Sequence, residues 1–348
     1  MRVDCKPGDA NGQCDGPWAI IELGGDPMPS GWILHNPAAG RLSAGMFLGR
    51  VGEALERNGW SIQTASTQVA QELKDLARAA VREGSDAVFV AGGDGSVGLI
   101  ASSLAGSTTA LGVLPSGTAN VWATELGLTG LAWTPGASLE RAAERLAVGE
   151  ARLVDVGEAN GHLFLLWAGA GLDARVVSAL EPRTRWMKLV PTALYLAEVL
   201  RSSTGWDGLE LEVEAEGRRW EGRFIVAVAS NIRRYAGGLL ELAPGALVDD
   251  GLLDFWLLGG RTTADVVVRI AQMLTQAHVQ APGVVHFRSP QATFRAPKDL
   301  HIHIDGEPLM TGTQLDIHVV PQHLWVLTAT EGEQRLFRPI DAMQSVVS

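Results

Sequence analysis

The stretch Ala87–Gly98, AVFVAGGDGSVG, decides the fold class of this chain. Its opening residues are apolar and suit a buried strand, and the segment 92–96, GGDGS, follows as a turn of small residues. The spacing of Leu99, Ile100 and Leu104 then predicts a helix. A strand that passes through a glycine turn into a helix is typical of a parallel sheet covered by helices.

The same strand–loop–helix unit occurs on both sides of this stretch. Trp32–Leu34 precedes the loop 35–40, HNPAAG, and Leu111–Leu114 precedes the loop 115–120, PSGTAN. We therefore predict an α/β fold with a Rossmann-like parallel-sheet N-terminal domain. Ligands bind such sheets beyond the carboxyl ends of the strands, and all three loops fall there.

The pattern changes after Glu150, where strand-length apolar segments follow one another between Gly, Pro and Asp residues. Helical patterns interrupt them at about 184–203 and 263–277. This indicates a second, β-rich and sandwich-like domain, with a boundary between residues 129 and 150. The predicted organisation is an irregular arm over 1–30, an α/β domain over 31–140, a β-rich domain over 150–327, and a tail over 328–348 that could pack back on the first domain.

Composition excludes several classes of protein. The 348 residues are 46% hydrophobic and 19% charged, and the longest apolar runs are too short to span a bilayer. A formal net charge of −11 argues against a protein that neutralises nucleic-acid phosphates over a broad surface. No secretory leader pattern opens the chain, so we expect a cytoplasmic protein.

The turn at 92–96 has the chemistry of an anion site. Glycines at 92, 93 and 95 let the backbone approach a ligand closely, and the N–H groups at a helix N-terminus favour a phosphate. A carboxylate at Asp94 would repel that phosphate. Its presence is explained if it takes a proton from a hydroxyl or reaches a magnesium ion through water. A strand-to-helix turn without a ligand is the alternative interpretation. A Gly-x-x-x-x-Gly-Lys-Ser/Thr loop does not occur in the sequence, which excludes P-loop nucleotide binding.

Further short motifs follow in a fixed order along the chain. With the two glycine loops, they are Asn36-Pro37 and Gly40, Asp155-Val156-Gly157, the run 169–173 (GAGLD), Asn231 with Gly237-Gly238, Ala243-Pro244, the run 249–254 (DDGLLD) and Asp305-Gly306-Glu307. This ordered set, from about residue 32 to 327, resembles the diacylglycerol kinase catalytic-domain family, which includes sphingosine, ceramide and bacterial lipid kinases.

The resemblance implies a two-domain, ATP-dependent lipid kinase with its active site in the cleft between the domains, Mg²⁺ as cofactor, and diacylglycerol or a related lipid as acceptor. It implies nucleotide contacts at Asn36, Thr67, Gly92, Gly93, Asp94, Gly95, Ser96, Val97, Gly98, Gly117, Thr118 and Asn120. It assigns Mg²⁺ to the carbonyls of Leu247 and Leu252 and the carboxylate of Asp250. Glu307 is the expected general base and Asp94 the second candidate, because members of the family differ over which acid takes the proton.

The sequence departs from the family pattern at a few positions. Ser96 stands where the family usually has Thr and keeps the hydroxyl, whereas Gly98 lacks the amide of the usual Asn, which weakens the expected nucleotide contact there. Pro191 is expected to begin a new helix, which would alter the lipid entrance.

Two other functions stay open. One is a small-molecule kinase similar to NAD kinase, and the other is a lipid-binding or regulatory module of the same fold without turnover. The acidic run 249–254 and the pair Asp305-Gly306 could also be plain turn residues.

Contact with a membrane is expected to be peripheral and transient. Basic and aromatic residues stand together at 183–189 and at Arg233-Arg234-Tyr235, a combination that suits lipid headgroups, although solvated surface is the alternative for both. His301 and His303 lack a further ligand at suitable spacing and are not predicted to bind a metal. Oligomers could form through exposed strand edges in the β-rich domain.

Overall fold

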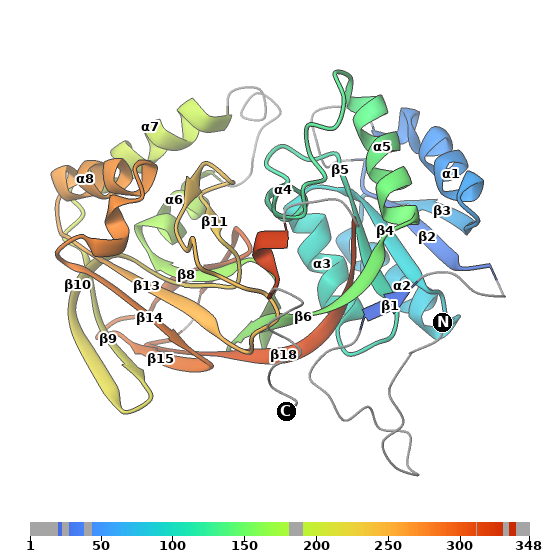
Figure 1. Cartoon of the computed structure of the whole chain (residues 1–348). Coiled ribbons are helices and arrows are strands. Elements are labelled where there is room, and N and C mark those ends of the chain that lie inside the picture. Colours follow the sequence, from blue (N-terminus) through green and yellow to red (C-terminus); the bar gives the residue numbers. More distant parts are fainter. Residues whose placement is uncertain are drawn as a thin grey trace, which may run out of the picture. The chain divides into compact units, whose positions relative to one another are not determined.

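The computed structural model describes residues 20–22, 28–37, 44–180, 191–310, 312–329 and 334–338. These residues form two compact units (Figure 1). Unit 1 contains the described residues up to Val154 and those from Gln322 onward, and unit 2 spans Asp155–Pro321. The predicted fold class is confirmed: unit 1 holds a parallel sheet with helices, and unit 2 is β-rich and sandwich-like.

Unit 1 is built around a parallel sheet in the strand order β3-β2-β4-β5, with the end of β18 beside β5. Every residue of β4 is buried, as expected of a central strand covered on both faces. The strands are β2 (Ser30–His35), β3 (Ser61–Ser66), β4 (Ala87–Gly92), β5 (Ala110–Pro115) and β18 (Gln314–Thr328).

Helices cover both faces of this sheet. α1 packs with α5, and α2 packs with α3 on the opposite face (Figure 1). In the core of this unit, the rings of Trp60 and Phe89 meet edge to face with centroids 5.1 Å apart. The helices are α1 (Leu48–Arg57), α2 (Ala70–Arg82), α3 (Asp94–Leu104), α4 (Val121–Glu125) and α5 (Pro135–Ala147), with a short 3₁₀ turn, η1, at Ala44–Met46.

Three features of unit 1 differ from the sequence prediction. The expected boundary region contains helix α5, which begins with Pro135 in its first turn and with Thr134 as its N-cap. β3 was not predicted, because it lies at the sheet edge and is largely exposed. The predicted irregular arm contains strand β1 (Ile20–Glu22), which pairs antiparallel with β6 (Glu150–Ala159).

The described end of the chain lies against unit 1. A 3₁₀ turn, η3, covers Gln334–Leu336, and Leu336 and Phe337 are buried. The guanidinium of Arg152 lies 4.0 Å from the centroid of the Phe337 ring, a cation–π contact.

Unit 2 consists mainly of antiparallel strands. Strand β10 is the central strand of this unit. Its first half pairs with β9, and its second half pairs with β8 on one side and β13 on the other. β13 in turn pairs with β14. Strand β10 runs from Arg218 to Ser230. The other strands are β7 (His162–Phe164), β8 (Trp167–Gly171), β9 (Leu209–Ala215), β11 (Arg234–Tyr235), β12 (Leu240–Glu241), β13 (Leu253–Gly259), β14 (Val284–Ser289), β15 (Gln291–Arg295), β16 (His301–Ile304) and β17 (Glu307–Met310).

The described helices of unit 2 are α6 (Leu172–Leu180), α7 (Pro191–Ser203) and α8 (Thr263–Leu274), with a 3₁₀ turn, η2, at Ala277–Gln280. The predicted helix start at Pro191 is confirmed, and residues 184–190 of the helical pattern expected over 184–203 lie outside the described residues. In the described part of the chain, no helix is both long and apolar enough to span a membrane. Trp122, Trp167 and Trp256 are buried.

The core of unit 2 contains a row of aromatic rings that yields the first prediction. Phe255 is fully buried, stacks on Phe287 at 5.0 Å between ring centroids, and meets Phe294 edge to face. We expect Phe255→Ala to lower the free energy of unfolding by about 3–5 kcal/mol, because the lost ring leaves a cavity. Urea titration followed by tryptophan fluorescence measures it. The matched control, Val267→Ala on the exposed face of α8, should change stability by less than about 0.5 kcal/mol.

Candidate functional site

The predicted nucleotide contacts lie at the carboxyl ends of the parallel strands. The strand register pairs the last residue of β2 with the last of β3, and the last residue of β4 with the last of β5. The loops after these strands carry Asn36, Thr67, the segment 92–98 and the segment 117–120. The chain continues from β2 to β3 on one side and returns to β4 on the other, so β2 and β4 meet at a topological switch point. Open α/β sheets bind ligands beyond the carboxyl ends of such strands.

The two glycine loops contact each other through their backbones. A Cβ atom on Gly117 would lie 2.3 Å from the Cα of Gly93, and one on Gly93 would lie 3.2 Å from the Cα of Gly117. A Cβ on Gly92 would lie 2.7 Å from the Cβ of Ser96, and the N–H of Ser116 donates to the Gly92 carbonyl at 3.2 Å. Larger side chains at these glycines would force the loops apart.

Asn120 shapes the second loop from within. Its φ of +51° lies in the left-handed region, which Asn tolerates better than most residues. The side-chain oxygen accepts from the N–H of Gly117 at 2.8 Å, and the side-chain amide donates to the carbonyl of the same glycine at 3.0 Å. Both ends of the Asn120 amide are therefore used to hold the loop closed over residues 117–120.

Asp94 lies where the two loops meet. It is the first residue of α3, and its Oδ1 accepts from the N–H of Trp122, in the first turn of α4, at 3.2 Å. Burial raises the pKa of the Asp94 carboxyl, although hydrogen bonds from nearby backbone N–H groups act in the opposite direction. A carboxylate whose pKa is raised toward neutrality is a better proton acceptor at neutral pH.

The other residues of the 92–98 segment differ in what they offer a ligand. Gly95 is exposed and Gly98 is half-buried. Ser96 is only 8% exposed. The Val97 side chain belongs to the core, and its N–H donates to the Gly93 carbonyl at 3.0 Å. The N–H groups at the start of α3 precede the first helical hydrogen bond and are therefore the donors that an anion would use.

Thr67 already has intramolecular partners. Its hydroxyl donates to the Glu72 carboxylate at 2.5 Å and accepts from the N–H of Val69 at 3.1 Å, at the start of α2. Next to it, His35 Nδ1 lies 3.2 Å from the hydroxyl of Ser66. Burial lowers the pKa of His35, which favours the neutral ring and a packing role.

In unit 2, Glu307 is an exposed residue at the start of β17, directly after the turn at 305–306. Two residues before that turn, His303 is buried and its Nε2 lies 2.7 Å from Oδ2 of Asp173. The same oxygen accepts from the hydroxyl of Tyr235. His303 therefore belongs to a buried polar cluster, which sequence patterns did not indicate because its members come from separate elements.

Two further motif residues hold backbone rather than ligand. Asp155 Oδ2 accepts from the N–H of Gly251 at 2.6 Å, and the Asp155 N–H donates to the Val248 carbonyl at 2.6 Å. Asn231 donates to the carbonyls of Asp155 and Leu165 at 3.0 and 3.1 Å. These bonds fix the acidic loop that precedes β13.

The carboxylates of the acidic loop are paired with residues of β14. Asp250 is 8% exposed; its Oδ1 accepts from the N–H of Leu252 at 3.1 Å, and its Oδ2 pairs with the guanidinium of Arg288. Asp254 accepts from Arg288 Nε at 3.3 Å, and its Oδ1 lies 2.7 Å from His286 Nε2. Sequence reasoning missed Arg288 and His286, whose only signal is their alternation on one strand opposite Asp254.

This pairing bears on the predicted magnesium ligands. A guanidinium bound to the Asp250 carboxylate repels a divalent cation and takes an oxygen that the cation would need. The donor set of Leu247, Asp250 and Leu252 therefore does not fit a resident Mg²⁺. Across the described ranges, no three His, Cys, Asp or Glu residues are grouped so that they could hold a metal ion.

The predicted headgroup surface at 233–235 is wrong for two of its three residues. Arg233 and Tyr235 are each 5% exposed, and the Tyr235 ring packs against Trp167 with centroids 5.4 Å apart. Packing against the core of unit 2 removes these side chains from any lipid surface. The other predicted surface, at 183–189, lies outside the described residues.

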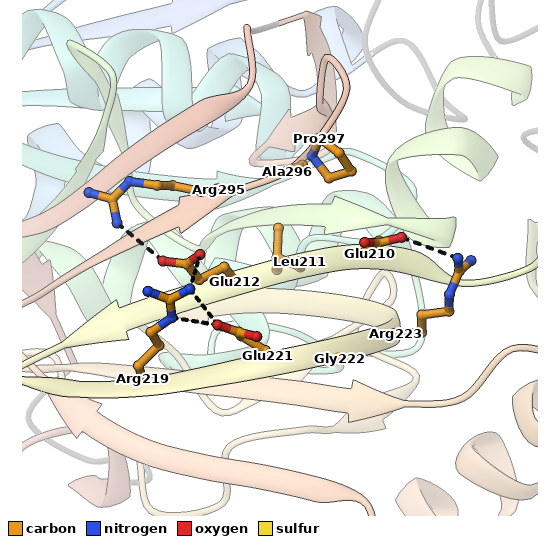
Figure 2. Close-up of a pocket in the computed structure, with 10 residues that line it drawn as sticks. All are labelled: Glu210, Leu211, Glu212, Arg219, Glu221, Gly222, Arg223, Arg295, Ala296 and Pro297. Carbon is orange, nitrogen blue, oxygen red and sulfur yellow. Dashed lines mark hydrogen bonds and ion pairs between the residues drawn. The ribbon is translucent and has the colours of Figure 1, made fainter.

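A groove of about 710 Å³ lies on the outer face of strands β9, β10 and β15 (Figure 2). Ion pairs cross it: Arg219 with Glu212, Arg223 with Glu210, and Arg295 with Glu212. Because its charged side chains neutralise one another and few apolar side chains line it, the groove does not suit an acyl chain. It contains none of the predicted site residues.

Comparisons with known proteins match two successive parts of the chain to two different family models. The family model of the diacylglycerol kinase catalytic domain matches residues 30–159, and that of the YegS C-terminal NAD kinase beta sandwich-like domain matches residues 167–328. The protein named diacylglycerol kinase of Bacillus subtilis (strain 168) is 27% identical over 314 residues, with 87% of this chain and 98% of the relative covered.

A second relative, named "Probable lipid kinase YegS-like", comes from Pseudomonas fluorescens. It is 32% identical over 263 residues, with 75% of this chain and 84% of the relative covered. The crystal structure of a diacylglycerol kinase from Bacillus anthracis has the same fold, with a TM-score of 0.67, 18% identity, and coverage of 88% of this chain and 99% of the other. The chain thus belongs to the diacylglycerol kinase catalytic-domain family of lipid kinases.

Proposed function

We propose that this protein transfers the γ-phosphoryl group of ATP to the hydroxyl of a lipid, diacylglycerol or a close relative. The observation that carries the proposal is the backbone contact between the two glycine loops at the switch point of the parallel sheet. Such loops offer N–H groups at a helix start, and the family to which the chain belongs consists of lipid kinases.

In this proposal, unit 1 binds the nucleotide. Backbone N–H groups at the start of α3 hold the phosphates, and Asn36, Thr67 and Thr118 contribute from the neighbouring loops. Gly92, Gly93, Gly95, Gly98 and Gly117 allow close approach, and Asn120 keeps the second loop in shape. Val97 is proposed to support the site from the core, since its side chain is 2% exposed. Ser96 lies on the same turn of α3 and keeps the hydroxyl of the family's Thr.

The acceptor hydroxyl must lose its proton while its oxygen attacks the γ-phosphorus and ADP leaves. We assign that proton to the carboxylate of Glu307, with Asp94 as the second candidate. Glu307 is exposed and can reach a substrate, whereas Asp94 has a raised pKa but also accepts a backbone hydrogen bond. Transfer needs positioning and charge neutralisation more than covalent chemistry.

Magnesium enters the proposal only with the nucleotide. When bound to the ATP phosphates, Mg²⁺ supplies neutralisation of the charge that develops during transfer. Asp94 lies next to the predicted phosphate position and could orient a water of that ion. The lipid acceptor resides in a bilayer, so the protein would meet it by peripheral contact.

A small-molecule kinase is the second candidate, because the matched C-terminal model is described as NAD kinase beta sandwich-like. Incubation with ATP and either NAD or dispersed diacylglycerol, followed by mass spectrometry, separates the two. A phosphorylated lipid supports the proposal and phosphorylated NAD overturns it. If neither acceptor is phosphorylated while lipid still binds, a module without turnover is indicated.

The contact between the glycine loops predicts a selective effect on nucleotide binding. Gly117→Ala should raise the KM for ATP at least about tenfold, because the new methyl group displaces the loop that lies against Gly93. Steady-state kinetics against ATP at saturating lipid measures this. Gly49→Ala, which adds the same methyl group where nothing lies within 4 Å, should leave the KM unchanged. Equal KM values for the two variants would contradict a nucleotide site at this loop.

The proton acceptor can be identified by two isosteric changes. Glu307→Gln should lower kcat about 10²–10⁴-fold without unfolding the protein, because the exposed side chain loses its basicity and keeps its size. Asp94→Asn keeps an oxygen for the Trp122 N–H and removes the charge. Rapid-quench measurement of lipid phosphorylation at several pH values compares them. Full activity in both variants would overturn both assignments.

The ion pair of the acidic loop predicts that stability does not depend on magnesium. EDTA should leave the Tm of the wild-type protein unchanged in the absence of ATP, because Arg288 already compensates Asp250 and Asp254. Arg288→Ala should lower stability by about 1–3 kcal/mol, since it removes the guanidinium from Asp250 and leaves Asp254 with His286 alone. Mg²⁺ should then restore part of the Tm.

Differential scanning calorimetry with and without Mg²⁺ tests the role of Arg288. The matched control is Arg261→Ala, which removes an exposed surface pair with Asp207 and should cost less than about 1 kcal/mol. A marked fall in the wild-type Tm on addition of EDTA would instead indicate a resident metal.

A further inference from the structure

The turn before Glu307 has a conformation that few sequences favour. Asp305 and Gly306 have φ values of +49° and +83°, and Ile304 pairs with Glu307 across the hairpin. Two successive left-handed residues between paired strands make a type I′ turn, for which Asp-Gly and Asn-Gly are preferred. Glu307 is the first residue after this turn, so the position of its backbone follows the turn.

The side chain of Asp305 does more than favour the turn. Its Oδ2 accepts from the N–H of Leu165 at 2.9 Å, and its Oδ1 accepts from the N–H groups of Leu166 and Trp167 at 2.8 and 3.1 Å. The N–H of Asp305 also donates to the Trp167 carbonyl at 3.0 Å. Backbone bonds to a carboxylate are charge-assisted and stronger than neutral ones.

These bonds tie the turn to a buried strand of unit 2. Residue 167 begins β8, which lies between β16 and β10 and is buried along its whole length. The segment just before it is also held by Asn231, which donates to the Leu165 carbonyl at 3.1 Å. The tip of the hairpin is thus anchored on its inner side by one carboxylate.

Another turn of the same kind shows that this anchor is not needed for folding a hairpin. Glu216 and Gly217 have φ values of +48° and +75° between β9 and β10, and the side chain of Glu216 is exposed. A residue with weaker preference for this conformation therefore suffices elsewhere in unit 2. Asp305 is a favoured turn residue whose carboxylate also accepts three hydrogen bonds from backbone N–H groups, and it lies close to an exposed acid.

We propose that Asp305 is a positioning residue for Glu307, holding the hairpin tip so that the Glu307 carboxylate meets the acceptor hydroxyl. The inference rests on the proposed function, in which Glu307 takes the proton. Glu307 is exposed, and the position of its backbone follows from the turn that Asp305 anchors. A displacement of about 1 Å in a reacting group can cost about 10²-fold in rate.

The experiment compares Asp305→Ala and Asp305→Asn in the full-length protein. Asp305→Ala removes the three hydrogen bonds that the carboxylate accepts from residues 165–167. It should lower kcat about 10- to 100-fold while the KM for ATP stays within about twofold. Asp305→Asn keeps the left-handed preference and one oxygen for Leu166 and Trp167, so it should recover part of the lost kcat. Urea titration reports whether each variant is folded, and Glu216→Ala is the control on the other turn.

Glu307→Gln is measured in parallel so that the two hypotheses fail differently. Normal kcat in Asp305→Ala with a low kcat in Glu307→Gln overturns the positioning role and leaves the kinase proposal intact. The positioning role is also overturned if Asp305→Ala raises the KM for ATP instead of lowering kcat, or if Asp305→Ala and Asp305→Asn lower kcat equally. If wild-type protein phosphorylates no lipid, or Glu307→Gln is fully active, the proposed function or its base has failed instead.

Discussion

The contact between the backbones of Gly93 and Gly117 is the constraint on which the arrangement of unit 1 depends. Parallel pairing of β4 and β5 ends both strands at one level, and only glycine lets the two loops close at the distances observed. The start of α3, the hydrogen bond from Trp122 to Asp94 and the ring closed by Asn120 all follow from this proximity. A site made of backbone in this way needs few specific side chains.

Unit 2 uses its acidic residues differently. Asp155 and Asp305 accept backbone N–H groups, Asp173 holds a histidine and a tyrosine, and Asp250 pairs with Arg288. Carboxylates used in this way stabilise loops whose own backbone donors would otherwise lack partners. An acid in a family motif is therefore no evidence of catalysis by itself, and exposure is what distinguishes Glu307 from the others.

Local patterns allowed the fold to be predicted where one segment carries its own signal. The strand, glycine turn and helix at 87–104 were predicted correctly because burial on both faces makes β4 continuously apolar. β3 escaped prediction because an edge strand needs no apolar face, and α5 because its region was interpreted as a boundary. The partners of Asp250 and Asp254 could not be predicted, since cross-strand register decides which residue of β14 faces them.

The two units also differ in the specificity that they can supply. Backbone N–H groups at a helix start recognise a phosphate by charge and shape, and they do so for any anion of that geometry. In the proposed mechanism, the choice of acceptor comes from the side of the reaction that carries the base, because there a side chain meets the hydroxyl. In the proposed mechanism that side is a short hairpin whose tip is held by Asp305, so selectivity for the acceptor would depend on a turn rather than on a strand or helix.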